Sequence, residues 1–363
     1  MKTLFSTLIL TIILFVGCKN NQAQVTNRAD YEQFMHFDKM EDIAMLNAEE
    51  SFWKGKVEAA PNQSPYFSKL AGAHAGLFET TGTIENLIES EKLLLEAIKK
   101  SNGQSAPLFR SLARNYISQH KFKEALVALQ KADSLGEGKT ATQKMLFDVY
   151  MELGNYTLAE KKLTEIKNLE DFDYLIRLAK WNDHIGDLQT AINLMERATA
   201  KAEESNNKAL KLWSYSNLAD FYGHAGRIED SYQYYLKTLA LDTNYTYSLK
   251  GIAWIVFSHE KNTEEAARIL DAINEKYRTP DYFLLKAELA SFERDELNKT
   301  KYLLAYVKMA ENPAYGHMYN NYNAALFADE LSKPEMAREI ALQEIMNRPT
   351  PESYNLLAWA EFK

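Results

Sequence analysis

The sequence predicts an all-α protein in which antiparallel helix pairs stack into a solenoid. Three observations carry this prediction. Apolar residues recur at helical spacing from Asp30 onward. In five predicted pairs a small or apolar residue of the first helix lies twelve positions before a small residue of the second, with a spacing of thirteen in a sixth pair. The pairs recur about every 34 residues. A chain of 363 residues with 46% hydrophobic content can bury a substantial core in such an arrangement.

The first eighteen residues form a unit of their own. An apolar run over residues 4–16 is shorter than the roughly twenty residues of a spanning helix and is typical of a secretory signal peptide. It ends Phe15-Val16-Gly17-Cys18, which resembles the lipobox of bacterial lipoproteins, although leucine is commoner at the first of these positions. The resemblance implies a signal peptide over residues 1–17 and a lipid on Cys18. The alternatives are cleavage nearby, with the cysteine discarded, or an uncleaved anchor.

Cys18 is the sole cysteine, so the chain can form no internal disulfide. Lys19 follows it, not the aspartate that retains bacterial lipoproteins in the inner membrane, and the resemblance therefore implies the outer membrane. Surface-exported lipoproteins carry acidic residues after such a lysine, whereas this chain has Asn20-Asn21. The sequence thus predicts a lipid-anchored envelope protein and leaves its periplasmic or surface-facing orientation open.

The remainder divides into three parts. Residues 18–29 are predicted to be a tether, because this segment is polar and lacks helical periodicity. Residues 30–63 are predicted to form introductory helices, which end before the proline at position 61. Residues 64–363 carry about eight helix pairs and a terminal unpaired helix.

The pair over residues 146–166 sets the register for the others. Phe147 and Tyr150 lie on the face of the first helix that is expected to be buried. Gly154 ends that helix, and the small side chain of Ala159 permits close approach of the second helix. The equivalent small residues of the second helices are Ser90, Ala125, Ala159, Ala191, Ser231 and Ala266, at intervals of 35, 34, 32, 40 and 35. This pattern resembles the tetratricopeptide repeat (TPR), which implies a right-handed superhelical solenoid. The 40-residue interval predicts a longer helix pair.

Charge and motifs exclude several function classes. The formal net charge of −8, without a basic stripe, disfavours nucleic-acid binding. There is no glycine-rich phosphate loop, no pair of histidines at metal spacing and no G-x-S-x-G motif. His259-Glu260 begins like a metalloprotease motif, but Thr263 stands where the second histidine is required. We therefore expect no enzyme activity, no cofactor and no metal.

The TPR resemblance implies a ligand groove on the concave face, lined by the first helices. The candidate groove residues in this register are Arg110, Arg114, Lys144, Asp148, Lys180, His184, Trp213, Asp220, His224 and Trp254. His184 and His224 occupy equivalent positions in adjacent helix pairs. Stacked pairs lie about 10 Å apart, whereas zinc ligands lie about 2 Å from the ion, so the two histidines are not expected to bind one zinc ion together. Some TPR proteins clamp a terminal carboxylate, and Asp148 stands where that clamp needs asparagine.

The carboxyl end predicts one more first helix, over residues 352–362, without a second helix to cover it. Leu356, Leu357, Trp359 and Phe362 make this helix strongly apolar. Three explanations stay open: all four side chains pack against the eighth pair, the sequence is truncated, or a partner covers the helix, by self-association for example.

The sequence therefore predicts a non-catalytic TPR scaffold, anchored to the envelope, that binds a peptide or protein segment in its concave groove. One alternative is a glycan-binding lipoprotein that serves an outer-membrane uptake system, although the long insertions of that family are lacking. The other is an enzyme with an unrecognised site.

Overall fold

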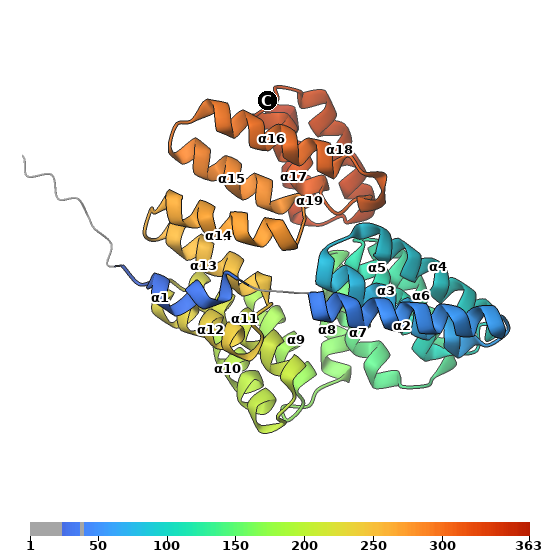
Figure 1. Cartoon of the computed structure of the whole chain (residues 1–363). Coiled ribbons are helices and arrows are strands. Elements are labelled where there is room, and N and C mark those ends of the chain that lie inside the picture. Colours follow the sequence, from blue (N-terminus) through green and yellow to red (C-terminus); the bar gives the residue numbers. More distant parts are fainter. Residues whose placement is uncertain (1–23, 37–39) are drawn as a thin grey trace, which may run out of the picture.

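The computed structural model describes residues 24–36 and 40–363, so the predicted signal peptide and Cys18 lie outside the described residues. The described chain is all-α, with nineteen α-helices that form sequential antiparallel pairs, which confirms the predicted TPR-like solenoid (Figure 1). The helices are α1 (Arg28–Tyr31), η1 (Glu32–Phe34), α2 (Met40–Ala59), α3 (Ser64–Thr81), α4 (Ile84–Lys100), α5 (Ala106–Ser118), α6 (Phe122–Leu135), α7 (Lys139–Glu152), α8 (Tyr156–Glu165), α9 (Phe172–His184), α10 (Leu188–Glu204), α11 (Lys208–His224), α12 (Ile228–Leu241), α13 (Thr246–Ser258), α14 (Thr263–Lys276), α15 (Asp281–Phe292), α16 (Glu296–Ala310), η2 (Pro313–Tyr315), α17 (Asn320–Asp329), α18 (Pro334–Asn347) and α19 (Pro351–Phe362).

The pair α7–α8 shows how local sequence produces the repeat. Gly154 follows α7 with φ +68°, a left-handed conformation that glycine adopts without strain. The side chain of Asn155 then accepts a hydrogen bond from the backbone N–H of Leu158 and so caps α8. Phe147 and Ala159 are both 0% exposed, so the two helices pack closely at the positions that set the register.

The 40-residue interval holds long helices. Both α10 and α11 have 17 residues, whereas α8 has 10 and α9 has 13. The predicted longer pair is therefore confirmed, and no inserted loop is needed to explain the interval.

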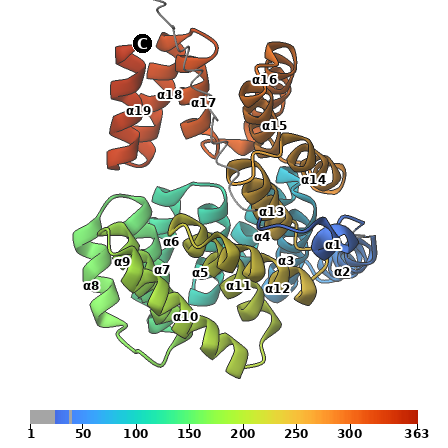
Figure 2. The same cartoon turned by 90° about the vertical axis from the view of Figure 1, so that its left-hand side faces the viewer.

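The solenoid curves until its last pairs meet its first pairs (Figures 1 and 2). Ile84 at the start of α4 shares a buried cluster with Tyr306 and Tyr315. At the α3–α4 turn, a Cβ added to Gly82 would lie 3.1 Å from Cγ2 of Thr279, which places this turn directly against the α14–α15 loop.

The next two turns meet the α18–α19 loop in the same way. The side-chain amide of Asn347 donates to the backbone oxygen of His120 at 3.1 Å, at the α5–α6 turn. At the α7–α8 turn, a Cβ on Gly154 would lie 2.9 Å from the backbone oxygen of Pro349. Consecutive turns of the first half therefore pack against loops between helix pairs of the second half, and the two halves form one closed body.

The residues before α2 also pack far from their neighbours in sequence. The Glu260 carboxylate accepts hydrogen bonds from the backbone N–H groups of Val25 and Thr26 at 2.8 and 2.6 Å. The hydroxyl of Tyr31 donates to Glu265 at 2.8 Å. Residues 24–29, the last part of the predicted tether, are thus fixed to the body. We call residues 25–35 the N-terminal strap.

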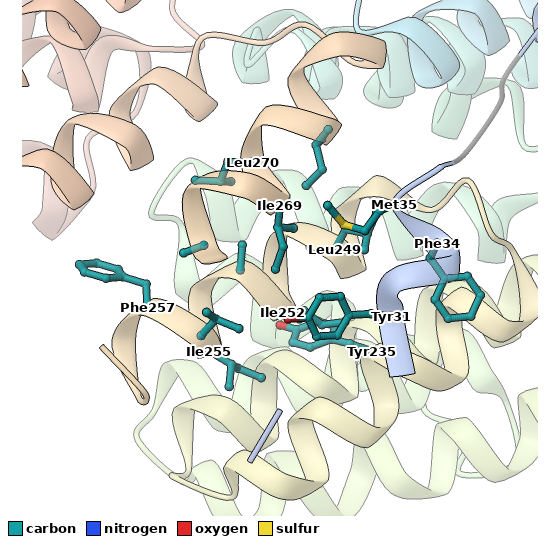
Figure 3. Packing of buried hydrophobic residues seen from close by; sticks show 14 of the residues in the cluster. Tyr31, Phe34, Met35, Tyr235, Leu249, Ile252, Ile255, Phe257, Ile269 and Leu270 are labelled. Carbon is teal, nitrogen blue, oxygen red and sulfur yellow. The ribbon is translucent and has the colours of Figure 1, made fainter. Parts of the chain in front are cut away.

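The strap contributes to a large apolar cluster between α12 and α14. Tyr31 is 1% exposed, and Figure 3 shows it beside Tyr235, with Met35 beside Leu249. Burial of side chains of this size stabilises the contact by roughly 1.5–3 kcal/mol each. The strap therefore belongs to the core of the second half, although the chain reaches that half only two hundred residues later.

Candidate functional site

A groove runs along the first helices of the N-terminal half. Its first cavity has a volume of about 560 Å³ and extends from α3 to α9. Its second cavity, of about 590 Å³, extends from α5 to α11. Arg114, Met145 and Arg177 line both cavities, so the two form one continuous groove. We call it the N-terminal groove.

Part of the floor of the N-terminal groove is apolar. The apolar side chains that line its first cavity include Ala71 and Ala75 of α3, Leu87 and Leu94 of α4, and Met145 of α7. Small and branched side chains at these places follow from the repeat, because the same residues pack the helices together. A long, partly apolar groove with a few polar groups is the usual form of a site for an extended ligand.

The structure brings six of the ten predicted groove residues together. Arg110, Arg114 and Lys144 line the first cavity, and Asp148, Lys180 and Trp213 line the second. His184 lines a separate cavity of about 300 Å³ between α9 and the α18–α19 loop.

The other three candidates, Asp220, His224 and Trp254, lie outside these cavities. Asp220 accepts hydrogen bonds from the hydroxyls of Tyr235 and Tyr247, at 2.5 and 2.6 Å, so its carboxylate is occupied within the body. The sequence pattern placed Asp220, His224 and Trp254 on the same helix face as the other candidates. It did not predict that the groove ends at α11.

Two predicted groove cations are held by carboxylates of the protein. The Lys144 ammonium lies 2.8 Å from Asp171 and 3.0 Å from Asp173, and its side chain is only 12% exposed. Lys180 lies 2.9 Å from Glu152. Such lysines position the groove wall, but their charge is already compensated.

The pKa values of two carboxylates in the second cavity are shifted in opposite directions. Burial raises the pKa of Asp148, and the nearby Arg177 and Lys180 offset this effect only in part. Burial also acts to raise the pKa of Glu152, but Lys180 and Arg348 outweigh it and the pKa is lowered. Glu152 is thus paired both with a lysine of the groove and with Arg348 at the α18–α19 loop.

Arg110 and Arg114 differ from the two lysines. Arg110 donates to the backbone oxygen of Glu137 at 2.7 Å and to the hydroxyl of Thr142 at 3.2 Å, both of which are neutral acceptors. Arg114 is exposed and forms no ion pair with any residue in the described part of the chain. These two guanidinium groups are consequently the uncompensated cations of the N-terminal groove.

The sequence register missed Arg177. Its guanidinium donates to Asp148 at 2.6 Å and to the backbone oxygen of Lys144 at 3.0 Å, so it ties α9 to α7 across the groove wall. It lies two positions before the small residue Ala179, a place outside the expected groove positions. The contact of Arg177 with α7 depends on how far one helix pair is shifted against the next, and the sequence pattern does not give that shift.

The aromatic and histidine candidates mainly contact other rings. Trp213 is 38% exposed and meets Phe172 edge-on, with ring centroids 5.9 Å apart. The ring of His184 lies 4.1 Å from that of Tyr156. Among the described residues, no three His, Cys, Asp or Glu side chains are grouped so that they could hold a metal ion.

The last helix, α19, is only partly covered. Ala360 is buried against the preceding pair, but Trp359 and Phe362 are 40% and 78% exposed. The explanation that all four apolar side chains pack against the eighth pair is therefore wrong. Trp359 instead donates to Asp329 at 2.9 Å and stacks on Phe362. Self-association through this helix stays a prediction.

Comparison with known proteins establishes the fold. No protein-family model and no curated protein matches the chain. A structure of the human IFIT1 dimer with PPP-AAAA is similar with a TM-score of 0.55 and 11% identity, over 82% of this chain and 68% of that chain. The APC/C hetero-tetramer Cut9-Hcn1 is similar with a TM-score of 0.50 and 19% identity, over 64% of this chain and 43% of that chain. A tetratricopeptide repeat protein from Parabacteroides merdae has a TM-score of 0.45 and 15% identity, over 66% and 94% of the two chains.

The two similarities with TM-scores of 0.50 and above support the fold alone and leave the ligand to the chemistry of the groove. Within residues 24–36 and 40–363, no helix is both long and apolar enough to cross a membrane.

Proposed function

We propose that this protein is a non-catalytic binding scaffold, held at the bacterial outer membrane through a lipid on Cys18. It binds an extended peptide or protein segment in the N-terminal groove. The single observation that carries the proposal is the pair of uncompensated guanidinium groups, Arg110 and Arg114, above an apolar floor.

The groove chemistry defines the ligand class. A guanidinium without an acidic partner binds a carboxylate through charge-assisted, often bidentate hydrogen bonds. The apolar floor at Leu87, Leu94 and Met145 favours an aliphatic or aromatic side chain beside that carboxylate. The expected ligand is therefore an extended segment that carries aspartate or glutamate next to apolar residues.

The test is an affinity pull-down from the source bacterium's envelope extract with three forms of the mature chain. Wild type is compared with Arg114→Glu and with Lys123→Glu, a matched charge reversal at an exposed position of α6 outside the groove. A partner of the groove is retained by wild type and by Lys123→Glu. It is lost from Arg114→Glu, since loss of a charged hydrogen bond costs about 1.5–3 kcal/mol, or roughly 10–100-fold in affinity. Equal recovery of every partner by all three forms would refute the proposal.

A further inference from the structure

The C-terminal half contains a cavity that none of the predicted groove residues lines. Its volume is about 550 Å³, and it lies between α13, α15, α16 and α17. The walls are mainly aliphatic, from Leu284, Leu285, Leu303, Ala325 and Leu326. We call it the C-terminal cavity. Its volume suits one or two side chains of a bound segment.

The charges around the C-terminal cavity oppose those of the N-terminal groove. Four carboxylates line it, against two amines: Asp281, Glu288, Asp329 and Glu330, against Lys250 and Lys299. The first cavity of the N-terminal groove has four cations and two carboxylates, namely Arg110, Arg114, Lys144 and Arg177 against Glu79 and Asp173. The C-terminal cavity therefore attracts positive charge.

Most of these carboxylates already have partners. Glu330 lies 2.7 Å from Lys299, and Asp329 lies 3.0 Å from Lys363 and accepts from Trp359. Asp281 and Glu288 form no ion pair among the residues that the structure describes, but Asp281 is hydrogen-bonded to the side chain of Tyr319. Glu288 is therefore the lining carboxylate that is left without a partner in the described chain. Desolvation by its surroundings raises the pKa of Glu288, although its side chain remains exposed to solvent.

Two other lining residues could contact a bound cation: Tyr322 through the face of its ring and Asn321 through its side-chain oxygen. Tyr322 is 55% exposed, and the face of such a ring attracts an ammonium or guanidinium group within about 6 Å. The side-chain oxygen of Asn321 is buried and accepts no hydrogen bond within the described chain. A ligand N–H that reaches this oxygen would satisfy it.

We propose that the C-terminal cavity is a second binding site, for a protein segment that presents a lysine or arginine beside an apolar side chain. The cation pairs with Glu288 and lies against Tyr322, while the apolar side chain enters the leucine-lined wall. This site is separate from the N-terminal groove, and the proposal does not depend on the function assigned to that groove.

The test uses two fluorescein-labelled nonapeptides and fluorescence anisotropy with the full mature chain. One peptide has two leucine–lysine pairs spaced by alanine, and its twin has glutamate in place of lysine. The protein forms are wild type, Glu288→Gln, Tyr322→Ala and Glu339→Gln, a matched control at an exposed carboxylate of α18 outside the cavity. Both tested side chains are exposed, and a thermal melt checks that each form is folded.

The lysine peptide is expected to bind wild type and Glu339→Gln equally. Its affinity falls about tenfold in Glu288→Gln, the loss of a charge-assisted contact, and roughly threefold in Tyr322→Ala, the loss of a cation–π contact. The proposal is overturned if the lysine peptide fails to bind wild type, or if both variants bind it as wild type does. Binding of the glutamate twin, measured with Arg114→Glu, tests the N-terminal groove separately, so either site can fail alone.

Discussion

The N-terminal groove and the C-terminal cavity lie on the same, first-helix side of one solenoid, yet they differ in which charge is left without a partner. In the groove, carboxylates of the neighbouring pair neutralise Lys144 and Lys180, and Arg114 remains uncompensated. In the cavity, Lys299 is neutralised by Glu330, while Glu288, Asp281 and Lys250 form no ion pair within the described chain, which leaves an excess of negative charge.

This difference shows what the repeat constrains. The small residues between helices are fixed by packing: Ala125, Ala159, Ala191 and Ala266 are all 0% exposed. The side chains that line the groove and the cavity are not packed between the helices of a pair, so they can change from pair to pair with less effect on the fold. One scaffold can therefore carry two sites of opposite preference.

The largest expected effect comes from exchanging the two charges. In the double variant Arg114→Glu/Glu288→Arg, each peptide meets a like charge where it had an opposite one. We expect each to lose about 3 kcal/mol at its original site, or roughly 100-fold in affinity. Each peptide should then prefer the other site, which competition anisotropy would measure. Unchanged preference of both peptides would show that the uncompensated charges do not determine specificity.

The next effect concerns the contact that joins the two halves. Alanine at Gly154 must adopt φ +68° and places its Cβ 2.9 Å from the Pro349 oxygen, whereas alanine at Gly226 must adopt φ +72° with open space around it. The left-handed conformation costs both variants about 1–2 kcal/mol. We expect Gly154→Ala to lose roughly 1 kcal/mol more, and to increase hydrogen exchange in α18 and α19.

Gly226→Ala is the control for this comparison, because it has the strain without the collision. If the two variants unfold at the same denaturant concentration and exchange alike, the contact between Gly154 and the α18–α19 loop contributes nothing to closure.

The smallest effect concerns the N-terminal strap, which contacts only the second half. Tyr31→Phe removes the hydrogen bond to Glu265 and is expected to cost about 1 kcal/mol, read as faster hydrogen exchange of residues 25–35. Exchange of α5 and α6 should not change, because the strap does not touch them. Faster exchange throughout the protein would contradict a local role for the strap.

Acid should act in opposite directions on two carboxylates, Glu265 at the strap and Asp148 in α7. Burial acts to raise the pKa of Glu265, but Arg268 and Tyr31 outweigh it, so the pKa is lowered in the folded protein. Its stabilising contribution is present above its unfolded pKa of about 4.3 and is lost as the pH falls through the folded value. The pKa of Asp148 is raised, so its protonation on acidification favours the folded state. Exchange measured from pH 6 to about pH 3.5 should therefore increase in the strap, whereas at α7 the effect of Asp148 opposes that of Glu152, whose pKa is lowered.

The sequence predicts the parts of this protein that depend on neighbours along the chain. Each helix pair, its turn and its buried small residue follow from spacing, because a helix places residues three and four apart on one face. The register of Phe147, Gly154 and Ala159 located the other pairs, and the 40-residue interval correctly indicated two long helices.

Only the tertiary structure decided which groups meet across the solenoid. Periodicity reports the face that a side chain occupies, but an ion pair such as that of Lys144 with Asp171 depends on the offset between stacked pairs. The same holds for the strap on Glu260, for the contact between Gly154 and Pro349, and for the absence of an ion-pair partner at Arg114 and Glu288 within the described chain. The sequence pattern thus determined a scaffold of helix pairs. The way in which these pairs stack determined which charged side chains have no ion-pair partner in the described chain and can therefore contact a ligand.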